Sequence, residues 1–266
     1  LIEGEKITVI LPIKGYQDDQ YVFMATSLGT VKKTRLSEFS NPRKAGIIAV
    51  DLNEGDFLVG AAITDGQHDV MLFSDAGKAV RFDENDVRPM GRTARGVRGM
   101  NLGDGHRVIA MLVAPAEAAE GTEAAVVDAN GNPIPSSVLT ATENGYGKRT
   151  PIVEYTRHGR GTKGMIAIQT SERNGKVVAA ALVSPEDQIM LITTGGVLVR
   201  TRVSEIREMG RATQGVTLIN VDEGTRLSGL QRIAESDSDE EGDDANDGEV
   251  SSDPVSGSSS DVAGDA

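Results

Sequence analysis

A fourfold internal repeat is the feature that most restricts what this chain can fold into. Four segments align on a shared glycine, at Gly29, Gly77, Gly145 and Gly196, with spacings of 48, 68 and 51 residues. In each copy, short apolar runs such as YVFMAT and FLVGAAIT alternate with Gly, Asn and Asp, which is typical of strands joined by tight turns. A period of about 50 residues with four strands per repeat predicts an all-β propeller, whose four-stranded blades must stack to bury their faces.

The repeats also predict how the chain is divided. We expect blade repeats at about residues 20–64, 69–113, 137–183 and 188–233. Together they form a folded domain of residues 1–234, interrupted by an Ala-, Glu- and Pro-rich surface insertion at about residues 115–136. Residues 4–13 match only the last part of a repeat, so we expect about four blades plus a remnant strand of a preceding blade. The chain starts at Leu1, and we interpret it as a fragment.

Charge is distributed unevenly along the chain. All 27 Lys and Arg lie at or before Arg232, whereas residues 235–266 hold 12 of the 40 acidic residues. The formal net charge of −13 therefore comes mostly from this tail, and does not exclude nucleic acid as a partner. The low apolar content of the tail predicts disorder. Two interpretations of its charge remain open: a solubilising appendage, and a mimic of DNA that competes for basic sites.

Basic residues recur at fixed positions of the repeat. The fourth residue after each shared glycine is Lys33, Arg81, Arg149 or Arg200, and the fifteenth is Lys44, Arg92, Arg160 or Arg211. Cations on edge strands can serve only to prevent aggregation, so recurrence alone leaves a structural role open. Basic clusters nevertheless occur on every blade, which predicts a circumferential band that contacts the phosphates of duplex DNA without reading bases. The predicted DNA-binding residues are Lys32, Lys33, Arg35, Arg43, Lys44, Lys78, Arg81, Arg92, Arg95, Arg98, Lys148, Arg149, Arg157, Arg160, Lys163, Arg200, Arg202 and Arg211.

Other kinds of chemistry find little support. The sequence has no Walker phosphate loop, no nucleophile elbow and no cysteine, and its three histidines show no metal-ligand spacing. We therefore expect no catalytic residue, no metal and no cofactor in this fragment, and we interpret His68, His106 and His158 as surface residues. The acidic residues nine positions after each shared glycine are interpreted as structural; they are Glu38, Asp86, Glu154 and Glu205. No apolar run approaches the ~20 residues of a membrane span, and a signal-peptide pattern is absent, which favours the cytoplasm.

Several strings of the sequence are similar to one known family. YVFMATSLGTVKKT, VMLFSDAGKAVRF, GYGKRT and VRTRVSEI, followed by GRATQGV, closely resemble the C-terminal domain of the DNA gyrase A subunit over about residues 1–234. The resemblance implies a β-pinwheel, in which adjacent blades exchange a strand, and DNA wrapping around the outer rim that enables negative supercoiling. It also implies a bacterial, ATP-dependent type IIA topoisomerase of two A and two B subunits. The nucleophilic tyrosine, ATP and Mg²⁺ would then belong to other parts of that holoenzyme, and we expect the isolated domain to be monomeric and associated with the nucleoid.

The sequence departs from this family in one motif. The family box Gln-Arg-Arg-Gly-Gly-Lys-Gly is absent, and RHGRGTKG at residues 157–164 is only a degenerate form of it. Because the family domain usually has six blades, we expect the first two blades to lie upstream of Leu1. Two alternatives stay open: the C-terminal domain of the topoisomerase IV A subunit, and a protein-binding propeller with no DNA role.

Overall fold

The computed structural model describes residues 6–116 and 136–233. All described residues belong to one compact unit. The acidic tail and residues 117–135 of the predicted insertion lie outside the described residues.

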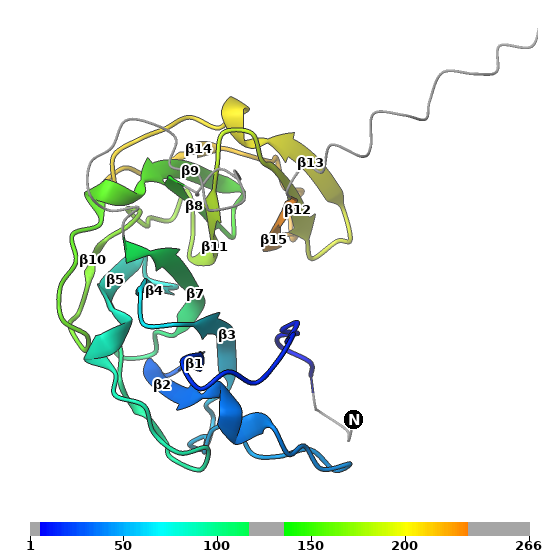
Figure 1. Cartoon of the computed structure of the whole chain (residues 1–266). Helices are drawn as coiled ribbons and strands as arrows, with labels where there is room; N and C mark the ends of the chain where they lie inside the picture. The colour runs from blue at the N-terminus through cyan, green and yellow to red at the C-terminus, as the bar shows by residue number, and fades with distance from the viewer. Residues whose placement is uncertain (1–5, 117–135, 234–266) are drawn as a thin grey trace, which may run out of the picture. The chain divides into compact units, whose positions relative to one another are not determined.

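The described residues form four antiparallel sheets, which follow one another along the chain (Figure 1). The first sheet contains, in spatial order, β3 (Leu58–Thr64), β1 (Tyr21–Thr26), β2 (Thr30–Arg35) and β6 (Val97–Arg98). The second contains β7 (Val108–Pro115), β4 (His68–Ser74), β5 (Lys78–Asp83) and β10 (Met165–Ile166). The third contains β11 (Val177–Val183), β8 (Ser137–Thr142), β9 (Tyr146–Pro151) and β14 (Val216–Thr217). The fourth contains β15 (Leu227–Ile233), β12 (Gln188–Thr193) and β13 (Leu198–Arg202).

Each four-stranded sheet receives its outer strand from the next repeat. The strand β6 lies between β5 and β7 in the sequence but pairs with β2 of the first sheet. In the same way β10 pairs with β5, and β14 pairs with β9. The all-β blade architecture and the exchange that the resemblance implied are therefore confirmed. The prediction of four strands per blade is wrong for the fourth sheet, which has three strands in the described part of the chain.

A short 3₁₀ helix follows the second strand of each sheet. These helices are η1 (Leu36–Phe39), η2 (Glu84–Asp86), η4 (Ile152–Glu154) and η5 (Val203–Glu205). Each contains or ends on one of the recurrent acidic residues. The carboxylate of Glu38 accepts a hydrogen bond from the backbone N–H of Arg92 at 3.2 Å, and that of Glu154 from Arg211 at 3.0 Å. The structural interpretation of these two acids is confirmed, although their partners lie in the next repeat.

The core consists of side chains packed between consecutive sheets. Along β4, every residue after His68 is buried, because alternate side chains meet different neighbours. Leu72 packs in one cluster with Phe23 of the first sheet, whereas Phe73 meets the ring of Tyr155 beside the third sheet, with centroids 5.9 Å apart. A sheet covered on both faces favours continuous apolar runs over strict alternation, which explains the apolar runs seen in the sequence.

The shared glycines form the hairpin turns between the first two strands of each sheet, as predicted. At Gly145 φ is +81°, and an added Cβ would lie only 2.2 Å from the carbonyl oxygen of Ile219. At Gly196 φ is +80°, but an added Cβ would meet nothing within 4 Å. Strand exchange explains this difference, because the turn of Gly145 packs against the segment that contains β14, whereas the fourth sheet has no exchanged strand among the described residues.

The expected remnant strand near the N-terminus is not formed. No strand forms between residues 6 and 20, nor in the apolar run of residues 46–52. Three isoleucines of these segments, Ile7, Ile10 and Ile48, are 67%, 83% and 63% exposed. A strand is defined by its hydrogen-bonded neighbour, and neither segment has such a neighbour in the described residues.

Candidate nucleic-acid interface

Eight of the eighteen predicted DNA-binding residues lie on four loops, which we term the rim loops: residues 41–46, 88–96, 157–164 and 207–215. The last three lead into the exchanged strands β6, β10 and β14, which form one edge of the first, second and third sheets. At the opposite edge, the inner strands β3, β7, β11 and β15 contact one another from sheet to sheet. The topology therefore places these three rim loops at the outer edge.

A close approach of backbones fixes the rim loops on the preceding sheet. The loop of residues 88–96 ends at Gly96, where φ is +101° and an added Cβ would lie 2.5 Å from the carbonyl oxygen of Val31. The equivalent Gly164 and Gly215 approach Ala79 and Gly147 to 2.5 and 2.6 Å by the same measure. Only glycine allows this geometry, so each loop is supported by a sheet that belongs to the previous repeat.

Four of the predicted DNA-binding residues are buried, with at most 2% of the side chain exposed: Lys32, Lys33, Arg81 and Lys148. Arg81 forms an ion pair with Asp69 at 2.7 Å and donates hydrogen bonds to two carbonyl groups of the next repeat at 3.1 Å. Lys33 lies 2.8 Å from the carboxylate of Glu84. These side chains cannot reach a phosphate, because the loops of the next repeat cover the second strand that carries them. The sequence prediction is therefore corrected at these four positions.

Four further predicted residues are half-buried: Lys78, Arg92, Arg149 and Arg211. The guanidinium of Arg149 donates to the carbonyl of Ile206 at 2.8 Å. Arg92 and Arg211 are equivalent, and each donates from Nη1 to a backbone carbonyl, that of Ile48 at 3.0 Å or of Ile166 at 2.8 Å. A guanidinium carries five N–H donors, so such a bond orients these side chains and leaves other donors for a ligand.

The other ten predicted residues are exposed: Arg35, Arg43, Lys44, Arg95, Arg98, Arg157, Arg160, Lys163, Arg200 and Arg202. Most of them lie on the rim loops or, as for Arg98, directly after one. Arg160 donates to the carbonyls of Asp86 and Arg98, which lie on either side of the rim loop of residues 88–96, at 3.0 Å each. Arg200 and Arg202 lie apart from the loops, on β13. The structure thus brings many of the exposed cations together at the outer edge and separates them from the buried ones.

Sequence reasoning missed a second set of recurrent cations, which precede or begin the inner strands: Arg107, Lys176 and Arg226. Lys176 lies 3.4 Å from Asp75 in the hairpin turn of the previous sheet, and Arg226 lies 2.6 Å from Glu143 in the next such turn. A basic residue just before three of the four inner strands was the available signal. These ion pairs connect consecutive sheets, and we assign them a structural role.

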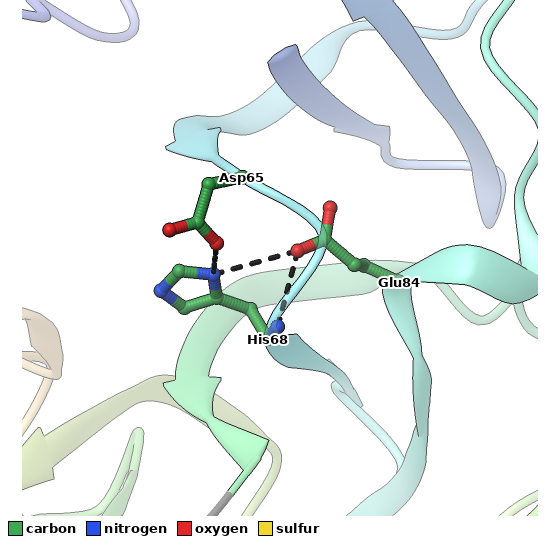
Figure 2. Close-up of side chains that lie close together, drawn as sticks. All are labelled: Asp65, His68 and Glu84. Atoms are coloured by element: carbon green, nitrogen blue, oxygen red, sulfur yellow. Dashed lines mark hydrogen bonds and ion pairs between the residues drawn. The ribbon is translucent and has the colours of Figure 1, made fainter. Parts of the chain in front are cut away.

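Figure 2 shows one cluster of side chains that could ligate a metal ion: Asp65, His68 and Glu84. The Nδ1 atom of His68 lies 3.0 Å from Asp65 and 3.4 Å from Glu84. Glu84 also accepts hydrogen bonds from the backbone N–H groups of Gly66 at 2.7 Å and His68 at 3.1 Å, and it pairs with Lys33. Because Lys33 supplies the positive charge and the carboxylate already accepts two backbone hydrogen bonds, this arrangement fits a junction between the first two sheets better than a metal site.

The charges of this junction depend on its hydrogen bonds. The bond with Glu84 is the main reason that the pKa of His68 lies above its ordinary value of 6.5. Burial alone would raise the pKa of Glu84, but hydrogen bonds from His68, Lys33 and Thr64 outweigh it and lower the pKa to about 2. The interpretation of His68 as a free surface histidine is therefore wrong.

Comparisons with known proteins agree with this architecture. The family model described as DNA gyrase C-terminal domain, beta-propeller, matches residues 20–65, 68–115, 136–184 and 187–234. The DNA gyrase A subunit of Salmonella typhimurium is 52% identical over 247 residues, which cover 93% of this chain and 26% of the relative. The corresponding protein of Escherichia coli is 49% identical over 235 residues, covering 88% of this chain and 25% of the relative. The chain thus spans about a quarter of the length of these curated relatives.

Two solved structures share the fold. A DNA gyrase A C-terminal domain superposes with a TM-score of 0.69 at 27% identity, covering 84% of this chain and 68% of that one. The C-terminal domain of a DNA topoisomerase IV superposes with a TM-score of 0.76 at 23% identity, covering 88% and 68%; this likeness concerns the fold alone. In the described residues, no helix is long and apolar enough to cross a membrane. The repeats, the exchanged strands and the family match together identify the chain as a member of the DNA gyrase C-terminal domain family.

Proposed function

We propose that this chain binds duplex DNA through its phosphates and wraps it along the rim loops, as the C-terminal domain of a DNA gyrase A subunit. The observation that carries the proposal is the sorting of the cations by burial. Cations without an exposed surface are paired inside the protein, while most of those on the rim loops are exposed at one sheet junction after another. Duplex DNA carries one negative charge per about 1.7 Å of its axis, so a row of cations suits it.

Contact with phosphates is favoured over recognition of bases. The helices in the described residues are single 3₁₀ turns, too short to fill a major groove. Aromatic residues make up 3% of the sequence, and Phe23, Phe73, Phe82 and Tyr155 are buried in the core. A platform for stacking single-stranded bases is therefore poorly supported, whereas exposed Arg and Lys on glycine-rich loops fit the backbone of a duplex.

The wider context of the proposal comes from the family. We place the chain in a bacterial type IIA topoisomerase of two A and two B subunits, located in the cytoplasm at the nucleoid. In that holoenzyme ATP, Mg²⁺ and the nucleophilic tyrosine act in other parts, and this region contributes DNA geometry. Wrapping costs elastic energy, since bending 20 to 30 base pairs by 40 to 90° costs roughly 1 to 6 kcal/mol. Contacts from several consecutive rim loops are needed to offset that energy.

Duplex affinity at two salt concentrations tests the proposal. Neutralising Z phosphates makes log K fall with log salt at a slope of about −0.9Z, for example between about 50 and 200 mM. Arg95→Ala with Arg98→Ala removes two exposed cations at one rim loop, and Lys6→Ala with Lys14→Ala removes two exposed cations elsewhere. We expect the first pair to weaken binding and flatten the slope by about 2 × 0.9, and the second pair to change both little. Absence of salt-sensitive binding by the unmodified chain would favour a protein-binding propeller instead.

A further inference from the structure

Two buried lysines lie beneath rim loops and hold the backbone carbonyls of those loops. Nζ of Lys32 donates to the carbonyl of Arg92, in the loop of residues 88–96, and to that of Ala49 at 2.6 Å. Nζ of Lys148 donates to the carbonyls of Gly210 and Arg211 in the loop of residues 207–215, the second at 2.5 Å. The two lysines are 1% and 0% exposed. Both ammonium groups are thus directed at loop backbone and not at solvent.

The lysines occur only where the loop has one particular sequence. Lys32 and Lys148 are each the third residue after the shared glycine, in the first and third repeats, and the loops above them read MGRTARG and MGRATQG. In the second repeat this position is Val80, and the loop of residues 157–164 above it reads RHGRGTKG.

The loop above Val80 is attached without a lysine. All three loops share one backbone bond to the second strand, here from the N–H of His158 to the carbonyl of Arg81 at 2.8 Å. This loop adds a bond from the N–H of Gly161 to the carbonyl of Gly99 at 2.6 Å and an ion pair of Arg157 with Asp69 at 2.7 Å. A buried lysine therefore accompanies the Met-Gly-Arg loops, and the chain contains its own example of a rim loop without one.

We infer that Lys32 and Lys148 are positioning residues for DNA binding, each of which holds a Met-Gly-Arg rim loop in the shape that presents its guanidinium groups to phosphates. The inference rests on the proposed function and assigns a new role to two residues that do not touch DNA. Without the ammonium, these loop carbonyls would lose their partners, and the loop would move to hydrate them. A binding site that is loosened in this way loses affinity even when all its ligating groups remain.

The protonation of the two lysines gives a second expectation for the positioning role, which is a pH dependence of DNA affinity. Burial lowers the pKa of each to about 8. The charged groups that face them are Glu38, Asp51 and Arg92 around Lys32, and Glu154 and Arg211 around Lys148. Exposed lysines titrate near 10.4 and arginines above about 12, so the phosphate ligands keep their charge while these two lysines lose theirs. DNA affinity should then fall between about pH 7 and pH 9.

The test compares two charge-matched variants of the full chain. Lys32→Met with Lys148→Met removes both buried ammonium groups, and Lys6→Met with Lys14→Met removes the same charge from exposed positions. We expect the first variant to bind a mixed-sequence duplex about tenfold more weakly than the second, a difference of about 1.4 kcal/mol, and to lose the pH dependence of the unmodified chain. In a background that already carries Arg92→Ala and Arg211→Ala, the lysine substitutions should have little further effect, because the positioned groups are gone.

The results separate the positioning role of the two lysines from DNA binding itself. Equal affinity of the two variants, or full additivity with the arginine substitutions, would overturn the positioning role while leaving DNA binding intact. Absence of duplex binding by the unmodified chain would instead remove the proposed function, and the inference with it. Should the Lys32→Met and Lys148→Met chain fail to fold, the single variants Lys32→Met and Lys148→Met decide, since an affinity equal to that of Lys14→Met contradicts the inference.

Discussion

Replacing one turn glycine by alanine measures the packing that strand exchange creates. Gly145 and Gly196 occupy the same hairpin turn of neighbouring sheets, with φ of +81° and +80°. An alanine Cβ would lie 2.2 Å from the carbonyl oxygen of Ile219 in the first case and would meet nothing within 4 Å in the second. Gly145→Ala and Gly196→Ala therefore share the backbone strain and differ in a single contact.

The expected losses of stability follow from the backbone strain at the glycine position and from the contact of the added Cβ. A left-handed conformation costs an alanine about 1–2 kcal/mol, and both variants carry that cost. Overpacking adds about 1–3 kcal/mol for Gly145→Ala alone. The clash also strains the hydrogen bonds that the carbonyl of Gly145 accepts from the N–H groups of Leu218 and Ile219, at 2.8 and 3.2 Å. We expect about 1–2 kcal/mol for Gly196→Ala and about 2–5 kcal/mol for Gly145→Ala.

Urea unfolding followed by circular dichroism measures the difference, and a thermal melt should show about 2–4 °C per kcal/mol for a domain of this size. Gly77→Ala serves as a second test, because its Cβ would lie 2.3 Å from the carbonyl oxygen of Ile168. This variant is a control, because the fourth sheet has fewer neighbouring sheets and its local opening would alter the stability loss measured for Gly196→Ala. If all three variants lose the same stability within about 0.5 kcal/mol, the exchanged strands do not press on these turns and the reasoning fails.

Three further predictions concern the charged groups. Arg81→Met should destabilise the fold by about 1–3 kcal/mol, because buried Asp69 keeps only Arg157 as a partner and the carbonyls of Ile152 and Tyr155 lose their donor, whereas the exposed Arg202→Met should cost under about 0.5 kcal/mol in the same urea titration. His68 has a raised folded pKa, so its contribution is complete below its ordinary value of 6.5 and is lost as pH rises through the folded value; unfolding free energies of His68→Gln should lack this decline. Deleting residues 235–266 should raise duplex affinity at low salt, because twelve tethered carboxylates compete for the cations, and equal affinities with and without the tail would leave it a solubiliser.

The regular part of the fold could be predicted from the repeat alone. A glycine that recurs between two short apolar runs indicates a hairpin, and the turns at Gly29, Gly77 and Gly145 all have the positive φ that this requires. The edges of the sheets could not be derived from the residues in the same way. Strands such as β6 contain two residues, too few to show a period, and their partners lie about one repeat earlier in the sequence.

The candidate site was predictable as a set of loops but not as a set of contacts. Lys32 and Lys33 are adjacent on β2, so alternation predicts that one of them faces solvent. Both are buried because the covering groups, near Arg92 and Glu84, come from the next repeat. Duplication of a repeat copies a structural cation as well as a functional one. Recurrence in the sequence therefore could not distinguish cations with a structural role from cations that bind DNA.

Because of strand exchange, one repeat of the sequence and one blade of the structure do not contain the same set of strands. A segment cut at residue 66 contains one complete repeat, yet its sheet lacks β6, which pairs with β2 from residues 97–98. A segment that ends after Met100 completes that sheet but carries β4 and β5 without β7 and β10. Every cut inside the described blades thus leaves an unpaired strand on one side of it, so shortening or lengthening such a domain requires junctions chosen by hydrogen-bonded partners and not by sequence similarity.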